Sequence, residues 1–154
     1  YRMVGLGALK YFILKVDPRK NMTFNPRESI DFNGNTGPFI QYTHARIRSV
    51  LRKAATQVIF EGQANLNQKE ADLIILLSQF PMAVQQAGAE LNPSVVANYM
   101  FDVAKEYNQF YHEFTILKEE DAGSRQLRLA LSLLTAQVIR NGMKLLGIDV
   151  PDRM

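Results

Sequence analysis

The chain has 154 residues, of which 47% are apolar and 21% charged, and its formal net charge is +3. This composition supports a folded core and excludes a disordered tail, and the absence of cysteine excludes disulfides, thiolate catalysis and zinc–sulfur sites. No apolar run approaches the roughly 18 residues of a membrane span. We therefore expect a soluble, cytoplasmic module with no membrane partner. Without an initiator or a signal-peptide pattern, it is expected to start within a longer protein.

The first third of the chain predicts a helix, a short helical turn and a boundary. Apolar residues at helical spacing predict a helix over 5–16, which the Asp17-Pro18 pair ends because the residue before proline avoids helical dihedrals. Asn25-Pro26 predicts a cap and a brief turn over 26–30. Residues 33–38 form the densest turn cluster and the predicted domain boundary. The apolar stripe of the first helix consists of Leu6, Leu9, Phe12, Ile13 and Val16.

Two long helical segments are expected in the middle of the chain. The first starts at residue 36 or 37 beside a proline and runs to about residue 57. A connection with Gly62, Asn65 and Asn67 follows. The second runs from Lys69 to about residue 90, and Pro81 is expected to kink it or split it in two.

The last two helices are predicted over 93–117 and 119–146. The final helix is so apolar between Leu127 and Leu134 that we expect it to be mostly buried. Gly147 stands where a left-handed C-cap residue belongs, and Ile148 can make the accompanying apolar contact. Strands are nearly absent from the pattern. The predicted fold class is therefore all-α, an antiparallel bundle of four to five long helices.

Charge is distributed unevenly along the chain. No acidic residue lies between Asp31 and Glu61, a stretch that holds three arginines, a lysine and a histidine. One helix face there carries Tyr42, Arg46, Ser49 and Lys53, and a neighbouring strip carries Gln41, Arg48 and Arg52. A cationic face with an aromatic ring suits a phosphate backbone with unstacked bases. The alternative is an ordinary solvated face that happens to be basic.

The helix over 93–117 is rich in aromatic residues. Tyr107, Phe110 and Phe114 lie on its apolar stripe and are expected in the core, whereas Tyr111 lies off the stripe beside Asn108. An off-stripe tyrosine among amides and a lysine can stack on a base, although an ordinary surface tyrosine is an equal alternative.

No catalytic constellation is present in the sequence. The glycine pairs at 5–7 and 34–37 lack the remaining residues of a phosphate loop, and His112-Glu113 lacks the second histidine of a zinc helix. The serines have no nucleophile-elbow context. Near the end of the last helix, Arg140, Asn141 and Lys144 also complement the helix dipole, which is a structural alternative to a binding role.

Two blocks of the sequence resemble a known family. Residues 32–46, Phe-Asn-Gly-Asn-Thr-Gly-Pro-Phe-Ile-Gln-Tyr-Thr-His-Ala-Arg, resemble the passage from the catalytic to the anticodon-binding domain of arginyl-tRNA synthetases. Arg128-Leu-Ala-Leu and residues 138–154, Val-Ile-Arg-Asn-Gly-Met-Lys-Leu-Leu-Gly-Ile-Asp-Val-Pro-Asp-Arg-Met, resemble the C-terminal end of the same enzymes. Residues 5–31 are similar to the stretch before the junction, so the resemblance covers almost the whole chain.

The resemblance implies an anticodon-binding bundle of the class I, DALR type over residues 37–154, preceded by the end of a catalytic domain over residues 1–36. The family ligates arginine to its tRNA using ATP and magnesium. Its His-Ile-Gly-His and Lys-Met-Ser-Lys types of ATP-binding signature are absent here and are expected upstream. The implied partners are an arginine-accepting tRNA, bound through its anticodon loop, and the upstream catalytic domain. By itself the chain is expected to hold no cofactor and to be inactive.

The resemblance also implies a set of contact residues. The Asp-Ala-Leu-Arg tetrapeptide that names the domain class does not stand in the last helix, so no contact of its arginine is transferred. Gly147 and Pro151 are expected to turn the chain back toward the basic face. A protein-interaction or scaffold module without nucleic-acid binding is the alternative, favoured if the basic residues are dispersed. The implied tRNA-binding residues are Arg46 and Arg48 for phosphates or bases, Tyr111 for stacking, Met154 with its terminal carboxylate at the anticodon pocket, Asn141 and Lys144 as weaker candidates, and Tyr42 and Lys53 on the basic face.

Overall fold

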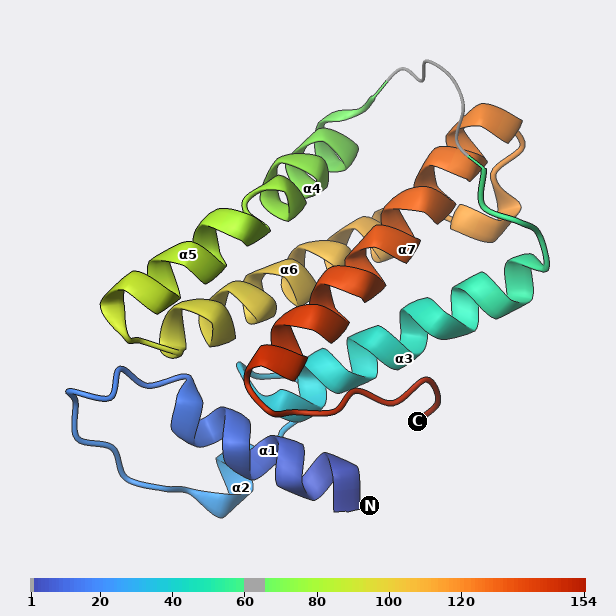
Figure 1. Ribbon diagram of the computed structural model, residues 1–154. Coiled ribbons are helices and arrows are strands. Elements are labelled where there is room, and N and C mark those ends of the chain that lie inside the picture. Colours follow the sequence, from blue (N-terminus) through green and yellow to red (C-terminus); the bar gives the residue numbers. More distant parts are fainter. Residues whose placement is uncertain (1, 60–65) are drawn as a thin grey trace.

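The computed structural model describes residues 2–59 and 66–154, and these form helices without any strand (Figure 1). α3, the α4–α5 pair, α6 and α7 alternate in direction, and α1 crosses one end of them. The predicted all-α antiparallel bundle is confirmed, and none of the described helices is long and apolar enough to cross a membrane. The elements are α1 (Arg2–Leu14), α2 (Pro26–Ser29), α3 (Gly37–Ala54), α4 (Gln68–Ser78), α5 (Phe80–Glu90), α6 (Ser94–Glu113), the 3₁₀ turn η1 (Ile116–Lys118) and α7 (Ala122–Leu145).

Local capping explains where several helices start and stop. The side chain of Thr36 accepts a hydrogen bond from the Phe39 amide at the start of α3. α3 ends at Ala54, three residues before the predicted end, because Ala55 takes a left-handed conformation with φ of 48°. A capping box between Asn67 and Glu70 starts α4. The other predicted loop residues, Gly62 and Asn65, lie outside the described residues.

The predicted helix from residue 69 to 90 is split rather than kinked. α4 ends at Ser78 and α5 starts at Phe80, with Gln79 between them. Pro81 has no amide hydrogen to donate to the helical carbonyl four residues earlier, so the hydrogen-bond ladder cannot continue through it. Both helices nevertheless form one leg of the bundle (Figure 1).

The prediction that one helix spans 93–117 was wrong at its C-terminal end. α6 ends at Glu113, and Phe114 is extended with φ of −117° and ψ of 130°. The Arg128 guanidinium of α7 lies 4.5 Å from the Phe114 ring centroid, and its Nε donates to Glu70 Oε1 at 2.8 Å. Glu119 also pairs with Arg128. The chain therefore turns at Phe114 so that this buried ionic cluster joins α4, α7 and the segment between α6 and α7.

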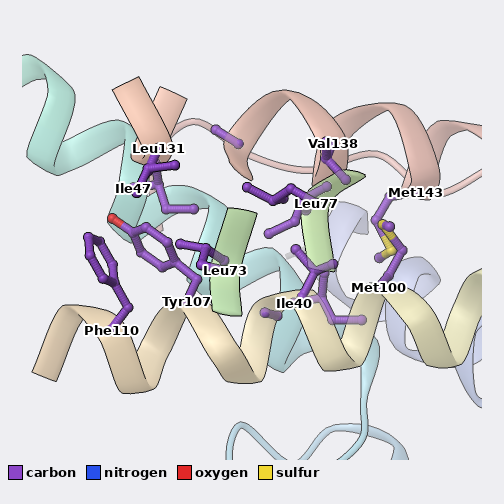
Figure 2. Packing of buried hydrophobic residues seen from close by; sticks show 14 of the residues in the cluster. Ile40, Ile47, Leu73, Leu77, Met100, Tyr107, Phe110, Leu131, Val138 and Met143 are labelled. Atoms are coloured by element: carbon purple, nitrogen blue, oxygen red, sulfur yellow. The ribbon is translucent and has the colours of Figure 1, made fainter. Parts of the chain in front are cut away.

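The hydrophobic core lies where α3, α4, α6 and α7 meet (Figure 2). Burying a large apolar side chain of this kind contributes about 1.5–3 kcal/mol. The expectation that α7 is mostly buried was wrong on one side, because Leu133 and Leu134 are 40% and 47% exposed. α7 buries one face of a helix, not its whole circumference. The labelled core residues are Ile40, Ile47, Leu73, Leu77, Met100, Tyr107, Phe110, Leu131, Val138 and Met143.

The predicted helix is present as α1, which spans Arg2–Leu14 instead of 5–16, but most of its apolar stripe is not the buried face. Leu6, Leu9 and Ile13 are 44%, 41% and 49% exposed, whereas the face that includes Gly7 and Tyr11 is buried. α1 packs on α3 by close backbone approach. The Tyr11 hydroxyl also donates a hydrogen bond toward the Ala97 carbonyl oxygen of α6, 2.8 Å away. An apolar face of α1 is thus left without a partner among the described residues.

Candidate nucleic-acid interface

The basic face of α3 borders an open hollow of about 460 Å³. Tyr111 of α6 forms part of its wall, and so do Arg153 and Met154 of the segment after α7. Four of the lining side chains are cationic, and none of the side chains of the described lining residues is acidic. The hollow therefore combines positive charge with exposed aromatic surface. Its complete lining is Tyr42, Ala45, Arg46, Ser49, Val50, Arg52, Lys53, Tyr111, Leu117, Arg153 and Met154.

Arg46 is held at this hollow by two rings and an amide. Its guanidinium carbon lies 4.8 Å from the Tyr42 ring centroid and 5.5 Å from the Tyr111 ring centroid. Its Nη1 donates to Asn108 Oδ1, and Asn108 Nδ2 donates in turn to Thr43 Oγ1 at 2.8 Å. Cation–π contacts and a neutral amide orient the charge without neutralising it. Within the described residues no carboxylate forms an ion pair with Arg46.

The Tyr111 ring has its own support. It is half-buried and lies parallel to the buried Tyr107 ring, with centroids 6.4 Å apart and planes 22° apart. Burial raises the pKa of Tyr107, which keeps that phenol neutral. Tyr111 is therefore supported from behind by the core, and it borders the hollow that Arg46 also lines.

The C-terminal segment 147–154, called the hook below, starts with the predicted C-cap. Gly147 has φ of 68°, and the Ile148 amide donates to the Met143 carbonyl at 2.9 Å. The Gly147 amide donates to the Lys144 carbonyl at 2.9 Å, which completes a Schellman-type ending. Ile148 is 2% exposed and anchors the turn. The C-cap prediction is confirmed.

From this anchor the hook runs along α3 (Figure 1). Gln41 Nε2 donates to the Asp149 carbonyl at 2.7 Å, and Arg52 Nη1 donates to the Asp152 carbonyl at 2.9 Å. Between them, His44 Nδ1 lies 2.8 Å from the Pro151 carbonyl oxygen. A carbonyl only accepts, so Nδ1 carries the proton. The strip Gln41–Arg48–Arg52 beside the basic face is therefore the seat of the hook.

His44 is buried beneath the hook as a neutral imidazole. Burial lowers its pKa, and the positive charges of Arg140 and Arg48 lower it further. The hydrogen bond to Pro151 and the negative charge of Asp152 act in the opposite direction. Its Nε2 is buried without a hydrogen-bond partner.

The structure brings together five of the eight predicted contact residues. Arg48 and Asn141 instead line a second hollow of about 280 Å³, together with His44 and Arg140. Lys144 is exposed and lines neither hollow. As expected, Arg153 and Met154 return toward Arg46 and Tyr111, and all four residues line the first hollow. The five residues at the first hollow are Tyr42, Arg46, Lys53, Tyr111 and Met154.

Three residues that line the first hollow or contact its lining have roles that the sequence pattern did not predict. Asn108 was noted only as a neighbour of Tyr111, yet it holds the Arg46 guanidinium. Leu117 was placed in a helix that ends four residues earlier. Arg52 was assigned to the neighbouring strip, although its long side chain reaches both the hook and the hollow. Only the acid-free stretch of sequence signalled that Arg52 belongs to a basic surface.

A family profile described as "DALR anticodon binding domain" matches residues 40–154. The chain belongs to the DALR anticodon-binding domain family. The DALR domain is matched although the Asp-Ala-Leu-Arg tetrapeptide is absent from its last helix, so membership rests on the pattern of the whole bundle.

The chain that contains this DALR domain is similar to arginine–tRNA ligases. It is 62% identical to that of Bacteroides fragilis, and the alignment covers 99% of this chain and 26% of that protein. The Porphyromonas gingivalis ligase is 57% identical over the same shares. The solved Thermus thermophilus arginyl-tRNA synthetase matches with a TM-score of 0.91 at 35% identity, covering 99% of this chain and 27% of that one. The chain thus spans about a quarter of the length of these relatives.

Proposed function

We propose that this DALR domain binds the anticodon loop of an arginine-accepting tRNA, within a longer protein that ligates arginine to tRNA using ATP and magnesium. The relatives' names support the reaction, and the hollow around Arg46 supports the binding. The observation that carries the proposal is the Arg46 guanidinium, held between Tyr42 and Tyr111 with its charge uncompensated by any described carboxylate.

The chemistry of the hollow fits an unpaired RNA loop. Bases that are splayed out of a stack lose their neighbours, and the half-exposed rings of Tyr42 and Tyr111 offer replacement surfaces. The cations at the rim supply attraction for the phosphates on either side of such a base. Because Asn108 and the two rings orient Arg46 in advance, its remaining N–H donors are available for a base edge or a phosphate at little cost in side-chain entropy.

The protein-interaction alternative required that Arg46, Arg48 and Tyr111 be dispersed around the bundle and that an exposed apolar groove dominate. Arg48 does lie apart, at the second hollow, but Arg46 and Tyr111 meet at the first hollow, which favours nucleic-acid binding. The apolar face of α1 is one part of the described surface that suits a protein contact. We assign it to the same longer protein: residues 1–36 would be the end of the catalytic domain and residues 37–154 the bundle, so that the upstream chain covers Leu6, Leu9 and Ile13.

The proposal is tested by replacing the two groups that define the hollow. Arg46→Met removes the charge and keeps an unbranched apolar stem, and Tyr111→Ala removes the stacking surface. Each should weaken binding of arginine tRNA by about 1–3 kcal/mol, the scale of a lost base-stacking contact, with little change in thermal unfolding. Filter-binding titrations measure the affinity.

Tyr111→Phe is the matched control because it keeps the ring, and Arg125→Met is the charge control because Arg125 lies in the first turn of α7, away from the hollow. Unchanged affinity for both Arg46→Met and Tyr111→Ala would overturn the proposal. Specific readout is checked with a tRNA whose anticodon bases are replaced. Equal affinity for the two tRNAs across a salt series would leave only unspecific binding.

A further inference from the structure

Arg48 of α3 and Arg140 of α7 converge on a single carboxylate oxygen of the hook. Arg140 Nη2 donates to Asp152 Oδ1 at 2.5 Å, and Arg48 Nε lies 3.3 Å from the same oxygen. The second approach makes an ion pair but no aligned hydrogen bond, so Arg48 Nε is buried and unsatisfied. One carboxylate oxygen therefore faces two guanidinium groups, and of the two only Arg140 donates a hydrogen bond to it.

The charge at this point is also incompletely balanced. Two cations face one anion, and Arg52 adds a further positive group through its hydrogen bond to the Asp152 carbonyl. The side chains of Arg48, Arg140 and Asp152 are 34%, 49% and 53% exposed, so a ligand from solution can reach all three side chains although Arg48 Nε itself is buried. The second hollow of about 280 Å³ lies beside them, with Asn141 as a further polar group in its wall.

The Asp152 carboxylate presents only one of its two oxygens, Oδ1, to both guanidinium groups, and a phosphodiester fits this arrangement better. Its two unesterified oxygens can each accept from a different guanidinium, and arginine is suited to such paired contacts. At about 100° per residue, Arg48 lies on nearly the opposite side of α3 from Arg46, within the hook's seat, and Arg52 lies between them. An RNA strand that crosses the hook can therefore contact both sides of α3.

We propose that Arg48 and Arg140 form a binding site for a phosphate of an RNA backbone, separate from the hollow around Arg46, and that Asp152 fills this site as an internal counter-ion until a phosphate replaces it. This inference rests on the proposed function. It keeps Arg48 among the phosphate contacts that the resemblance implies, and adds Arg140 as its partner and Asp152 as the group that competes with phosphate. The hook would then form part of the wall of the first hollow and, through Asp152, block the phosphate site beside the second hollow.

The first test measures how salt weakens binding. The probe is an RNA hairpin with the anticodon stem and loop of an arginine tRNA, titrated between about 50 and 200 mM salt. Arg48→Met and Arg140→Met should each make the slope of log affinity against log salt shallower by roughly 0.7 to 1, because each variant loses one phosphate contact. Arg125→Met, on the first turn of α7 and far from Arg140, should leave the slope unchanged. Unchanged slopes for Arg48→Met and Arg140→Met would overturn the inference.

The second test asks whether one substitution strengthens or weakens RNA binding. If Asp152 competes with phosphate, Asp152→Asn should strengthen binding of the hairpin by roughly two- to fivefold, the scale of an exposed ion pair. If Asp152 only tethers the hook, the same change should weaken binding, because the wall that carries Arg153 and Met154 loosens. Weaker or unchanged binding by Asp152→Asn contradicts the counter-ion role.

The two proposals fail in distinguishable ways. Loss of affinity in Arg46→Met and Tyr111→Ala, with no effect at Arg48 and Arg140, leaves the proposed function standing and removes the phosphate site. Inorganic phosphate tests the phosphate site without RNA. It should shift the NMR signal of the Arg48 Nε–H in the wild-type chain, and it should shift that signal more strongly in Asp152→Asn. Those shifts would support the site even if the hairpin failed to bind, and no shift in either chain would contradict it.

Discussion

At the residue scale, Arg46 and Arg48 are two positions apart on α3 and have different surroundings. Arg46 lies between two tyrosine rings, whereas Arg48 faces Asp152 of the hook. Their sequence context is equally basic, and no local pattern separates them. What separates them is the helical rotation of about 200° between positions i and i+2, which turns one toward α6 and the other toward α7.

His44 gives the clearest residue-scale prediction about pH. Its pKa in the folded protein is lowered from 6.5, so the folded state prefers the neutral imidazole and the unfolded state binds more protons between the two values. Its contribution to stability is therefore complete above pH 6.5 and is lost as the pH falls toward the folded pKa. We expect a lower thermal midpoint at about pH 5 than at about pH 7.5, because protonation of the imidazole then favours the unfolded chain.

The matched variant is His44→Asn. Its amide can still donate to the Pro151 carbonyl, but it cannot be protonated. The pH-dependent difference should shrink in this variant, while other titrating groups contribute equally to both proteins. A difference that stays the same would show that His44 does not cause it.

At the scale of elements, the packing of α1 on α3 depends on two glycines that let the backbones approach. A Cβ on Gly37 would lie 2.6 Å from the Gly7 carbonyl oxygen and 3.0 Å from Tyr11 Cβ. Gly37→Ala should therefore destabilise the fold by about 1–3 kcal/mol through overpacking. Gly88→Ala in exposed α5 meets nothing within 4 Å and should be neutral or stabilising by up to about 1 kcal/mol. Urea unfolding of both variants checks the contrast; equal stabilities would contradict it.

The hook is the second element whose role can be isolated. Its anchor, Ile148, precedes Pro151, and Arg153 and Met154 are exposed. Removing residues 151–154 should therefore leave a bundle that still unfolds cooperatively but is less stable by about 1–3 kcal/mol, because His44 loses the Pro151 carbonyl. The same truncation should weaken tRNA binding, because the first hollow loses a wall. Unfolding and binding are measured on the same preparation. A truncated chain that no longer unfolds cooperatively would show that the hook is structural.

At the scale of the whole molecule, the antiparallel bundle supports the contact surface from behind. The Tyr111 ring packs on the Tyr107 ring in the core. The ionic cluster of Arg128, Glu70 and Glu119 positions the segment that carries Leu117. Both supports join helices that are far apart in the sequence. The surface around Arg46 therefore depends on the assembled bundle and not on α3 alone.

A further whole-molecule prediction concerns catalysis. The chain spans about a quarter of the length of its relatives. Its sequence contains neither the His-Ile-Gly-His nor the Lys-Met-Ser-Lys type of ATP-binding signature. We expect no arginine-dependent exchange of pyrophosphate into ATP by this chain alone, at a protein concentration where its tRNA binding is measurable. Clear exchange activity would contradict the placement of the catalytic residues upstream.

The sequence by itself determined the helices, the antiparallel bundle, the glycine C-cap and the acid-free basic stretch. These features depend on side-chain periodicity, capping residues and turn residues, which act over a few positions. The same local information placed Tyr42, Arg46 and Lys53 on one helix face. It also located Tyr111 off the apolar stripe of its helix.

Only the tertiary structure decided which face of α1 is buried, where α6 ends, and that Gln41, His44 and Arg52 hold the hook. Each outcome depends on contacts between segments far apart in the chain: 108 residues separate Gln41 from Asp149 and 107 separate His44 from Pro151. Such contacts come from burial and hydrogen-bond satisfaction in the assembled molecule. Local periodicity carries no information about them, and for that reason the sequence placed Arg48 on a strip beside the basic face but did not predict that the hook lies on that strip.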